Sequence, residues 1–163
     1  MQILLTMKNG GEMLFDLYPE KAPLTVDNFV SLINKRFYDG LTFHRVVKDY
    51  VIQGGSEDNT CMCPTDFSIT GEFAENGYDT GLDHKRGALS MARDDDFNSG
   101  GTQFFVVHKD AHKLDGRYAA FGKLAKGFEI LDAIASVDTA PPEKENRPLE
   151  EQVIETIRMM PHP

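Results

Sequence analysis

The chain has 163 residues, a length that suits one domain and allows a real hydrophobic core. Its 26 acidic and 17 basic side chains give a net charge of -9, which repels phosphate backbones and anionic lipid surfaces. We therefore expect a single domain over residues 1–163 that binds neither nucleic acid nor membranes.

The N-terminus and the cysteines indicate a cytoplasmic protein. Residues 1–7 form too short an apolar run for the core of a signal peptide, and no later stretch reaches a membrane-spanning length. Cys61 and Cys63 are one residue apart, so a disulfide between them would be strained and free thiols are expected. His108 and His112 could join these thiols on a metal only if their segment were helical. We expect no metal site and a monomeric protein.

The first half of the chain predicts a hairpin followed by a helix. Apolar residues alternate over residues 3–7 and again over residues 13–17, around a turn at Asn9-Gly10. Apolar residues at positions 26, 29, 30 and 33 then follow the spacing of an amphipathic helix. Pro23 lies near the first turn of this helix, and Lys35-Arg36 lies in its last turn.

Residues 41–47 are rich in β-branched and aromatic side chains and predict a strand. Alternation along this strand places Phe43, Arg45 and Val47 on one face and His44 on the other. We expect hydrogen bonds within the strand to hold His44 rather than a role for it as a base.

The second half of the chain predicts a long irregular segment and then short strands. Residues 54–86 are rich in Gly, Asp, Asn, Thr and Glu, which is typical of a structured surface loop. Three apolar strands, a second helix, a solvated loop and a closing strand follow it. In chain order they cover residues 88–92, 102–107, 119–123, 128–135, 141–146 and 152–159.

The pattern of many short strands and two helices favours an antiparallel barrel or sandwich. Several common catalytic motifs are absent from the sequence, including a phosphate loop, a nucleophile elbow and a zinc-binding His-Glu-x-x-His helix. Pattern alone leaves the choice between barrel and sandwich open.

Five segments, in this order and approximate spacing, closely resemble motifs of the cyclophilins. They are Phe43-His44-Arg45-Val46-Val47, Gln53-Gly54-Gly55, Leu89-Ser90-Met91-Ala92, Gly101-Thr102-Gln103-Phe104-Phe105 and Leu114-Asp115-Gly116-Arg117-Tyr118-Ala119-Ala120-Phe121-Gly122. The resemblance covers nearly the whole chain. It implies a mainly β fold, a closed eight-stranded antiparallel β-barrel capped by two α-helices, with peptidyl-prolyl cis-trans isomerase activity and no cofactor.

The resemblance also implies a set of site residues. It places the catalytic guanidinium at Arg45 and its supporting amide at Gln53. The expected substrate-binding residues are Tyr50, Val51, Ala92, Arg93, Gln103, Phe105, Lys113, Leu114 and Tyr118. Because Phe104 and Phe105 are adjacent on a strand, one must face the core and the other the groove, and the resemblance chooses Phe105 for the groove.

The site departs from the family pattern at its rim. Many members carry tryptophan where Lys113 stands and histidine where Tyr118 stands, and methionine and phenylalanine often fill the positions of Val51 and Tyr50. A tyrosine ring can still close an apolar pocket while its hydroxyl stays wet. Lys113 removes an indole donor and a broad apolar face, so we expect weak binding of cyclosporin, the family's cyclic peptide inhibitor.

The expected partners of such an isomerase are proline-containing peptides and unfolded or flexible proteins, whose folding it would assist. Two other functions remain open from the sequence. With an altered rim, the protein could instead be a proline-peptide binding module or chaperone with little turnover, although the presence of both Arg45 and Gln53 argues against this. A barrel that carries a small ligand inside is a third possibility, but apolar, aromatic-rich strands predict a filled interior.

Overall fold

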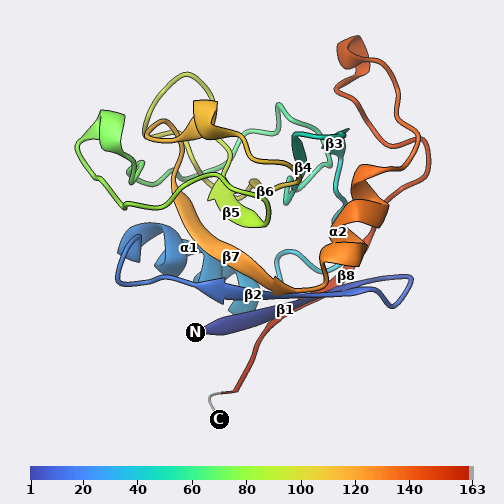
Figure 1. Ribbon diagram of the computed structural model, residues 1–163, viewed down its shortest axis with the longest axis horizontal. Helices are drawn as coiled ribbons and strands as arrows, with labels where there is room; N and C mark the ends of the chain where they lie inside the picture. The colour runs from blue at the N-terminus through green and yellow to red at the C-terminus, as the bar shows by residue number, and fades with distance from the viewer. Residues whose placement is uncertain (162–163) are drawn as a thin grey trace.

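One eight-stranded antiparallel sheet organises the protein, which we describe from a computed structural model covering residues 1–161. The strands lie side by side in the order β3-β4-β6-β5-β7-β2-β1-β8. Figure 1 shows the sheet curling so that β3 to β6 lie across from β1, β2, β7 and β8. The strands are β1 (Gln2–Met7), β2 (Glu12–Leu17), β3 (Arg45–Val47), β4 (Val51–Gly54), β5 (Ala88–Met91), β6 (Phe104–Val107), β7 (Ala120–Lys126) and β8 (Ile154–Met159).

Two helices pack on the main core from opposite ends of the curled sheet (Figure 1). Helix α1 (Pro23–Asn34) begins with proline at its first turn, where the missing N–H leaves no hydrogen bond unmade. Helix α2 (Phe128–Ala135) buries Leu131 and Ile134. Both helices were predicted, although α1 ends before Lys35. Three short 3-10 helices complete the list: η1 (Ala74–Asn76), η2 (His112–Leu114) and η3 (Pro142–Lys144).

The two faces of β4, β5 and β6 carry separate apolar clusters. Val46, Ile52, Val106 and Leu89 are cross-strand neighbours and all belong to the large cluster in the interior of the curled sheet. Their sequence neighbours point outward, because successive strand residues alternate between faces. The outward cluster consists of Val51, Ala88, Phe105, Val107, Ala111 and Leu114. The filled interior agrees with the sequence prediction and leaves the outer face for ligands.

The predicted closed barrel is wrong in its closure: the sheet is an open half-barrel. Strands β3 and β8 form its two edges and do not pair with each other as strands. Among residues 1–161, an isolated bridge between Thr42 and Val153, ahead of both strands, links their segments. Backbone hydrogen bonds join residues 40–43 to residues 152–154, but they do not continue into β3, so the two edge strands stay unpaired.

The predicted strand over residues 41–47 is also shorter than expected. Only Arg45–Val47 is a strand, and Phe43 lies in the main core rather than on the outer face with Arg45 and Val47. His44 precedes the strand and is 1% exposed, and neither ring nitrogen has a hydrogen-bond partner within residues 1–161. The predicted hydrogen-bonded His44 is therefore wrong. Burial lowers the pKa of His44, which favours a neutral ring behind Arg45.

The remaining strand predictions hold, with one omission. The hairpin, the irregular segment after Gly54 and the four later strands all occur close to the predicted positions. Strand β4 was not predicted, because only the first two of its residues, Val51–Gly54, are apolar and Gln53-Gly54 end the apolar run. Within residues 1–161, no helix combines the length and apolar character needed to cross a bilayer.

Gly127, between β7 and α2, tests how closely the helix is packed on the sheet. It has φ +102°, and a Cβ there would collide with the backbone carbonyl of Glu12. Gly10 has φ +94° and open space around it. We expect Gly127→Ala to lower the free energy of unfolding by about 3 kcal/mol and Gly10→Ala by about 1 kcal/mol. Urea unfolding followed by circular dichroism measures both, and equal losses would contradict the packing described here.

Candidate functional site

Strand register places the central site residues in one row on the outer face. Arg45 on β3 lies directly opposite Gln53 on β4, and Gln53 lies opposite Phe105 on β6. Phe105 in turn lies opposite Ser90 on β5. Cross-strand partners share a face of the sheet, so four residues separated along the sequence become neighbours. Phe104 belongs to the main core, which confirms the predicted division between the two phenylalanines.

A directed chain of hydrogen bonds holds the Arg45 guanidinium. Arg45 Nη1 donates to Gln53 Oε1 at 3.1 Å, and Gln53 Nε2 donates to Gln103 Oε1 at 2.9 Å. Gln103 Nε2 donates in turn to the backbone carbonyls of Cys61 at 3.2 Å and Thr60 at 3.4 Å. Each amide oxygen is thereby committed as an acceptor. The chain ends in main-chain atoms, so the guanidinium is oriented from the backbone.

An open pocket lies beside this guanidinium. It has about 440 Å³ of unfilled space, part of it open to solvent. Arg45 and Gln53 form its polar side, and Phe105 and Tyr118 meet edge to face on its apolar side with ring centroids 5.7 Å apart. The full lining is Arg45, Tyr50, Val51, Gln53, Ala92, Arg93, Phe105, Leu114 and Tyr118. The structure thus brings together every predicted site residue except Gln103 and Lys113, which lie just outside the lining.

Two cations cover aromatic rings at the rim of the pocket. Lys113 Nζ lies 4.4 Å from the ring centroid of Tyr50. The Arg93 guanidinium lies 4.5 Å from the centroid of Tyr118 and also packs over Phe73 and Phe97. Such contacts are favourable and restrict the rings. Partial burial raises the pKa of Tyr50, so its hydroxyl stays neutral at physiological pH.

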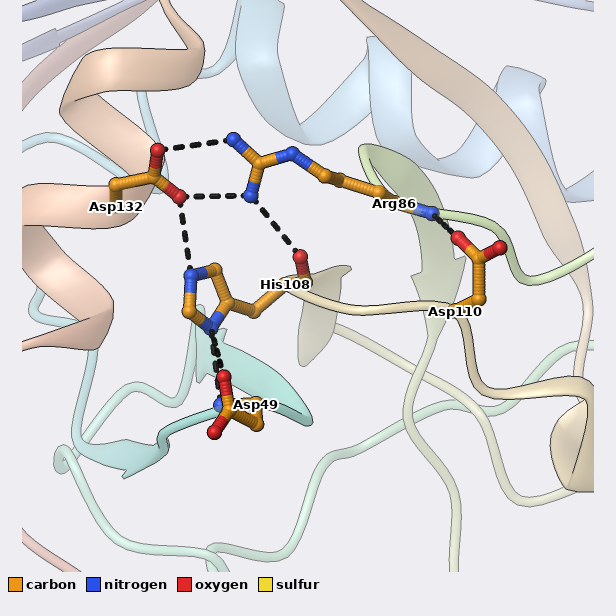
Figure 2. A network of polar contacts seen from close by, with 5 residues as sticks. All are labelled: Asp49, Arg86, His108, Asp110 and Asp132. Carbon is orange, nitrogen blue, oxygen red and sulfur yellow. Dashed lines mark hydrogen bonds and ion pairs between the residues drawn. The ribbon is translucent and has the colours of Figure 1, made fainter.

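A polar network fixes the turn that carries Tyr50 (Figure 2). Arg86 binds Asp132 on α2 through two hydrogen bonds of 2.7 and 2.9 Å. Asp132 also contacts His108 Nε2 at 3.0 Å, while His108 Nδ1 accepts from the backbone N–H of Asp49 at 2.9 Å. The backbone N–H of His108 donates to the Tyr50 carbonyl at 2.8 Å. The turn is therefore anchored to both α2 and β6.

A second polar group lies behind the pocket and was missed from the sequence. His84 is fully buried and contacts Ser90 Oγ at 2.8 Å and Asp115 Oδ1 at 3.0 Å. Ser90 and Asp115 stand inside recognisable motifs, but their partner lies in the irregular segment of residues 54–86. Neither periodicity nor spacing places a side chain of such a segment, so the sequence offers no signal for this group.

The structure does not assemble the metal ligands considered from the sequence. His108 directly follows β6 and His112 begins a 3-10 helix, so they are not one turn apart on an α-helix. The one cluster of possible ligands among the described residues consists of Asp83, His112 and Asp115. His112 and Asp115 already bind each other at 2.8 Å, and neither cysteine takes part.

Comparison with known proteins gives a consistent result. A family model described as "Cyclophilin type peptidyl-prolyl cis-trans isomerase/CLD" matches residues 2–159. Peptidyl-prolyl cis-trans isomerase B of Bacillus subtilis is 41% identical over 132 residues, which cover 81% of this chain and 89% of that protein. Peptidyl-prolyl cis-trans isomerase-like 1 of Neurospora crassa is 36% identical over 151 residues, covering 92% and 89%.

A solved structure shows the same arrangement of the chain. A cyclophilin-type peptidyl-prolyl cis-trans isomerase of Cryptosporidium parvum aligns with a TM-score of 0.88 and 28% identity. The alignment covers 99% of this chain and 100% of that one. That crystal structure was determined in the presence of the dipeptide Ala-Pro. The similarity therefore extends over nearly all of the described residues.

The thiol of Cys61, next to the anchor of the hydrogen-bond chain, should be unreactive. Burial, assisted by the nearby Glu145 carboxylate, raises the pKa of Cys61 to about 11. At pH 8 about one thiol in a thousand is then ionised, against about one in four for an ordinary cysteine. In a Cys63→Ser variant, we expect iodoacetamide to react at least about tenfold more slowly with the native protein than with the unfolded protein. The native rate should keep rising between pH 9 and 11, and a plateau near pH 9 would contradict the raised pKa.

Proposed function

The chain belongs to the cyclophilin-type peptidyl-prolyl cis-trans isomerase family, and from this premise we propose how its own residues carry out the isomerisation. Arg45, held by Gln53 beside the apolar pocket, speeds rotation about Xaa-Pro bonds in peptides and flexible chains. The observation that carries this proposal is the position of Arg45 on the polar side of a pocket whose other side is apolar. The pocket then takes the proline ring.

The reaction requires shape and directed polarity rather than bond making. A proline amide interconverts by rotation over a barrier of roughly 18 to 20 kcal/mol, with no nucleophile, metal or proton shuttle. In the twisted transition state amide resonance is lost. The proline nitrogen gains a lone pair, while the preceding carbonyl oxygen gives up negative charge. A catalyst must therefore bind the twisted amide more tightly than the planar one.

Arg45 should act on the proline nitrogen. A donor on the carbonyl that precedes the proline would stabilise the planar ground state and slow the reaction. A donor aimed at the nitrogen makes its hydrogen bond only when the lone pair forms. The fixed direction of the guanidinium, set by Gln53 and Gln103, supports this role because the donor needs no reorganisation during rotation.

The hydrogen bond from Arg45 is not sufficient by itself. A charge-assisted hydrogen bond contributes about 1.5 to 3 kcal/mol, whereas a thousandfold acceleration needs about 4 kcal/mol. The apolar side of the pocket, formed by Val51, Phe105 and Leu114, supplies the remainder. It removes water that solvates the more polar planar amide and fixes the ring while the rest of the peptide turns.

The open pocket suits exposed proline segments rather than prolines inside folded domains. A substrate must present the ring and the residue before it at the surface, as unfolded and flexible proteins do. The structure of the related Cryptosporidium protein, determined in the presence of the dipeptide Ala-Pro, supports proline peptides as partners. We further propose that the protein works as a cytoplasmic monomer and assists folding.

The role of Arg45 can be tested with a short Ala-Pro peptide. We expect Arg45→Ala to lower kcat/KM by about 10- to 150-fold, mainly through kcat, because the lost contact is made only in the transition state. Arg45→Lys should keep part of the activity, since it retains the positive charge but loses the planar guanidinium with its fixed N–H donors. NMR exchange spectroscopy measures the cis-trans rates directly. Equal exchange with the unmodified protein and with Arg45→Ala would refute the mechanism.

The rim should determine the affinity for cyclosporin. Lys113 packs over Tyr50 and offers neither an indole donor nor a broad apolar face. We expect weak cyclosporin binding by the unmodified protein and at least about tenfold tighter binding by Lys113→Trp. Lys113→Met, which adds apolar surface without the indole, is the matched control and should change the affinity less. Tight binding by the unmodified protein in a calorimetric titration would remove the basis of this prediction.

A further inference from the structure

A buried Ser-His-Asp group lies directly behind the proline pocket. The Asp115 carboxylate can only accept when ionised, so His84 Nδ1 carries the hydrogen and donates to it at 3.0 Å. His84 Nε2 is then the acceptor for the Ser90 hydroxyl at 2.8 Å. Burial lowers the pKa of His84 despite its hydrogen bond to Asp115, which favours the neutral ring. Every hydrogen-bonding group of the histidine side chain is thus occupied.

The hydrogen bonds of Asp115, His84 and Ser90 follow the same order as in the catalytic triad of a serine hydrolase, but this group cannot act as one. In a hydrolase, the serine oxygen must reach a substrate carbonyl at the surface. Ser90 and His84 are both 0% exposed. No substrate carbonyl reaches the hydroxyl, so the group must serve the architecture of its surroundings.

Those surroundings are the apolar side of the pocket. The His84 ring stacks on Phe105, with centroids 5.9 Å apart and planes inclined by 21°. Ser90 lies opposite Phe105 in the sheet register. Asp115 directly follows Leu114 and also accepts from the backbone N–H of His84 at 2.7 Å. The His84 imidazole therefore packs on Phe105 and hydrogen-bonds to Asp115, the residue after Leu114. In this way it supports two pocket residues that come from different parts of the chain.

We infer that His84 is a positioning residue that fixes the side chains of Phe105 and Leu114, which bind the proline ring. Through Ser90 it holds the position on β5 beside Phe105, and through Asp115 it holds the segment that presents Leu114. The inference rests on the proposed function, because the fixed pocket matters only if the pocket takes proline. It assigns a task to a side chain that never touches the substrate.

Substitution of His84 should weaken binding of the proline ring more than it slows the isomerisation step. His84→Phe keeps an aromatic ring against Phe105 and removes both side-chain hydrogen bonds. We expect it to raise KM for an Ala-Pro peptide by about tenfold with a smaller change in kcat, because the ring is held less well while Arg45 is intact. His84→Asn retains a donor toward Asp115 and should recover part of the loss. Arg45→Ala should show the opposite division between kcat and KM.

A control variant distinguishes positioning from general stability. Arg158→Met breaks a paired contact with Asp39, with distances of 2.6 and 2.7 Å, on the edge strand β8 away from the pocket. It should lower the thermal midpoint without changing KM. NMR should show the Leu114 methyl and Phe105 ring resonances shifting in His84→Phe but not in Arg158→Met.

The outcomes are separable. Unchanged KM and unchanged Leu114 and Phe105 resonances in His84→Phe, with only a lower thermal midpoint, would overturn the inference. Shifted resonances with no isomerase activity in the unmodified protein would support positioning while refuting the proposed function. If His84→Phe does not fold, Ser90→Ala removes only the hydroxyl, and it should cause a smaller rise in KM with the same resonances affected.

Discussion

The site depends on the register between β3, β4 and β6. Because Arg45 lies opposite Gln53 and Gln53 opposite Phe105, the guanidinium, its support and the pocket wall share one face of the sheet. A slip of one residue would turn Arg45 toward the core and bring Val46 outward. The inward packing of Val46, Ile52 and Val106 prevents this slip, since it would expose an apolar row. Core packing on one face therefore specifies the chemistry on the other.

The two sides of the pocket are supported in different ways, each matched to its task. The polar side rests on a chain of uncharged amides that orients the charged donor and ends in backbone carbonyls near Cys61. The apolar side includes Phe105 and is backed by the buried His84 group. A neutral imidazole adds hydrogen bonds there without adding charge behind the pocket. Both arrangements place preformed contacts where the twisted amide needs them.

Sequence reasoning reached most of the fold and most of the pocket, for identifiable physical reasons. Hydrophobic periodicity predicted the first hairpin and both helices, because each buries a regular face. The family resemblance predicted the residues of the pocket, which periodicity cannot rank. Local pattern failed at β4, where only Val51 and Ile52 are apolar, and at Phe43, which lies in the core because the strand begins only at Arg45. It also failed at His84, whose position is decided by tertiary contacts with Ser90 and Asp115 across an irregular segment.

The central claim is that Arg45 and Gln53 work as one unit, with Gln53 acting only through the guanidinium that it holds at 3.1 Å. A double-mutant cycle of kcat/KM on an Ala-Pro peptide tests it most directly. The account predicts that Gln53→Ala lowers activity in the unmodified protein but causes little further loss when Arg45 is already alanine. Losses that simply add in the double variant would contradict it.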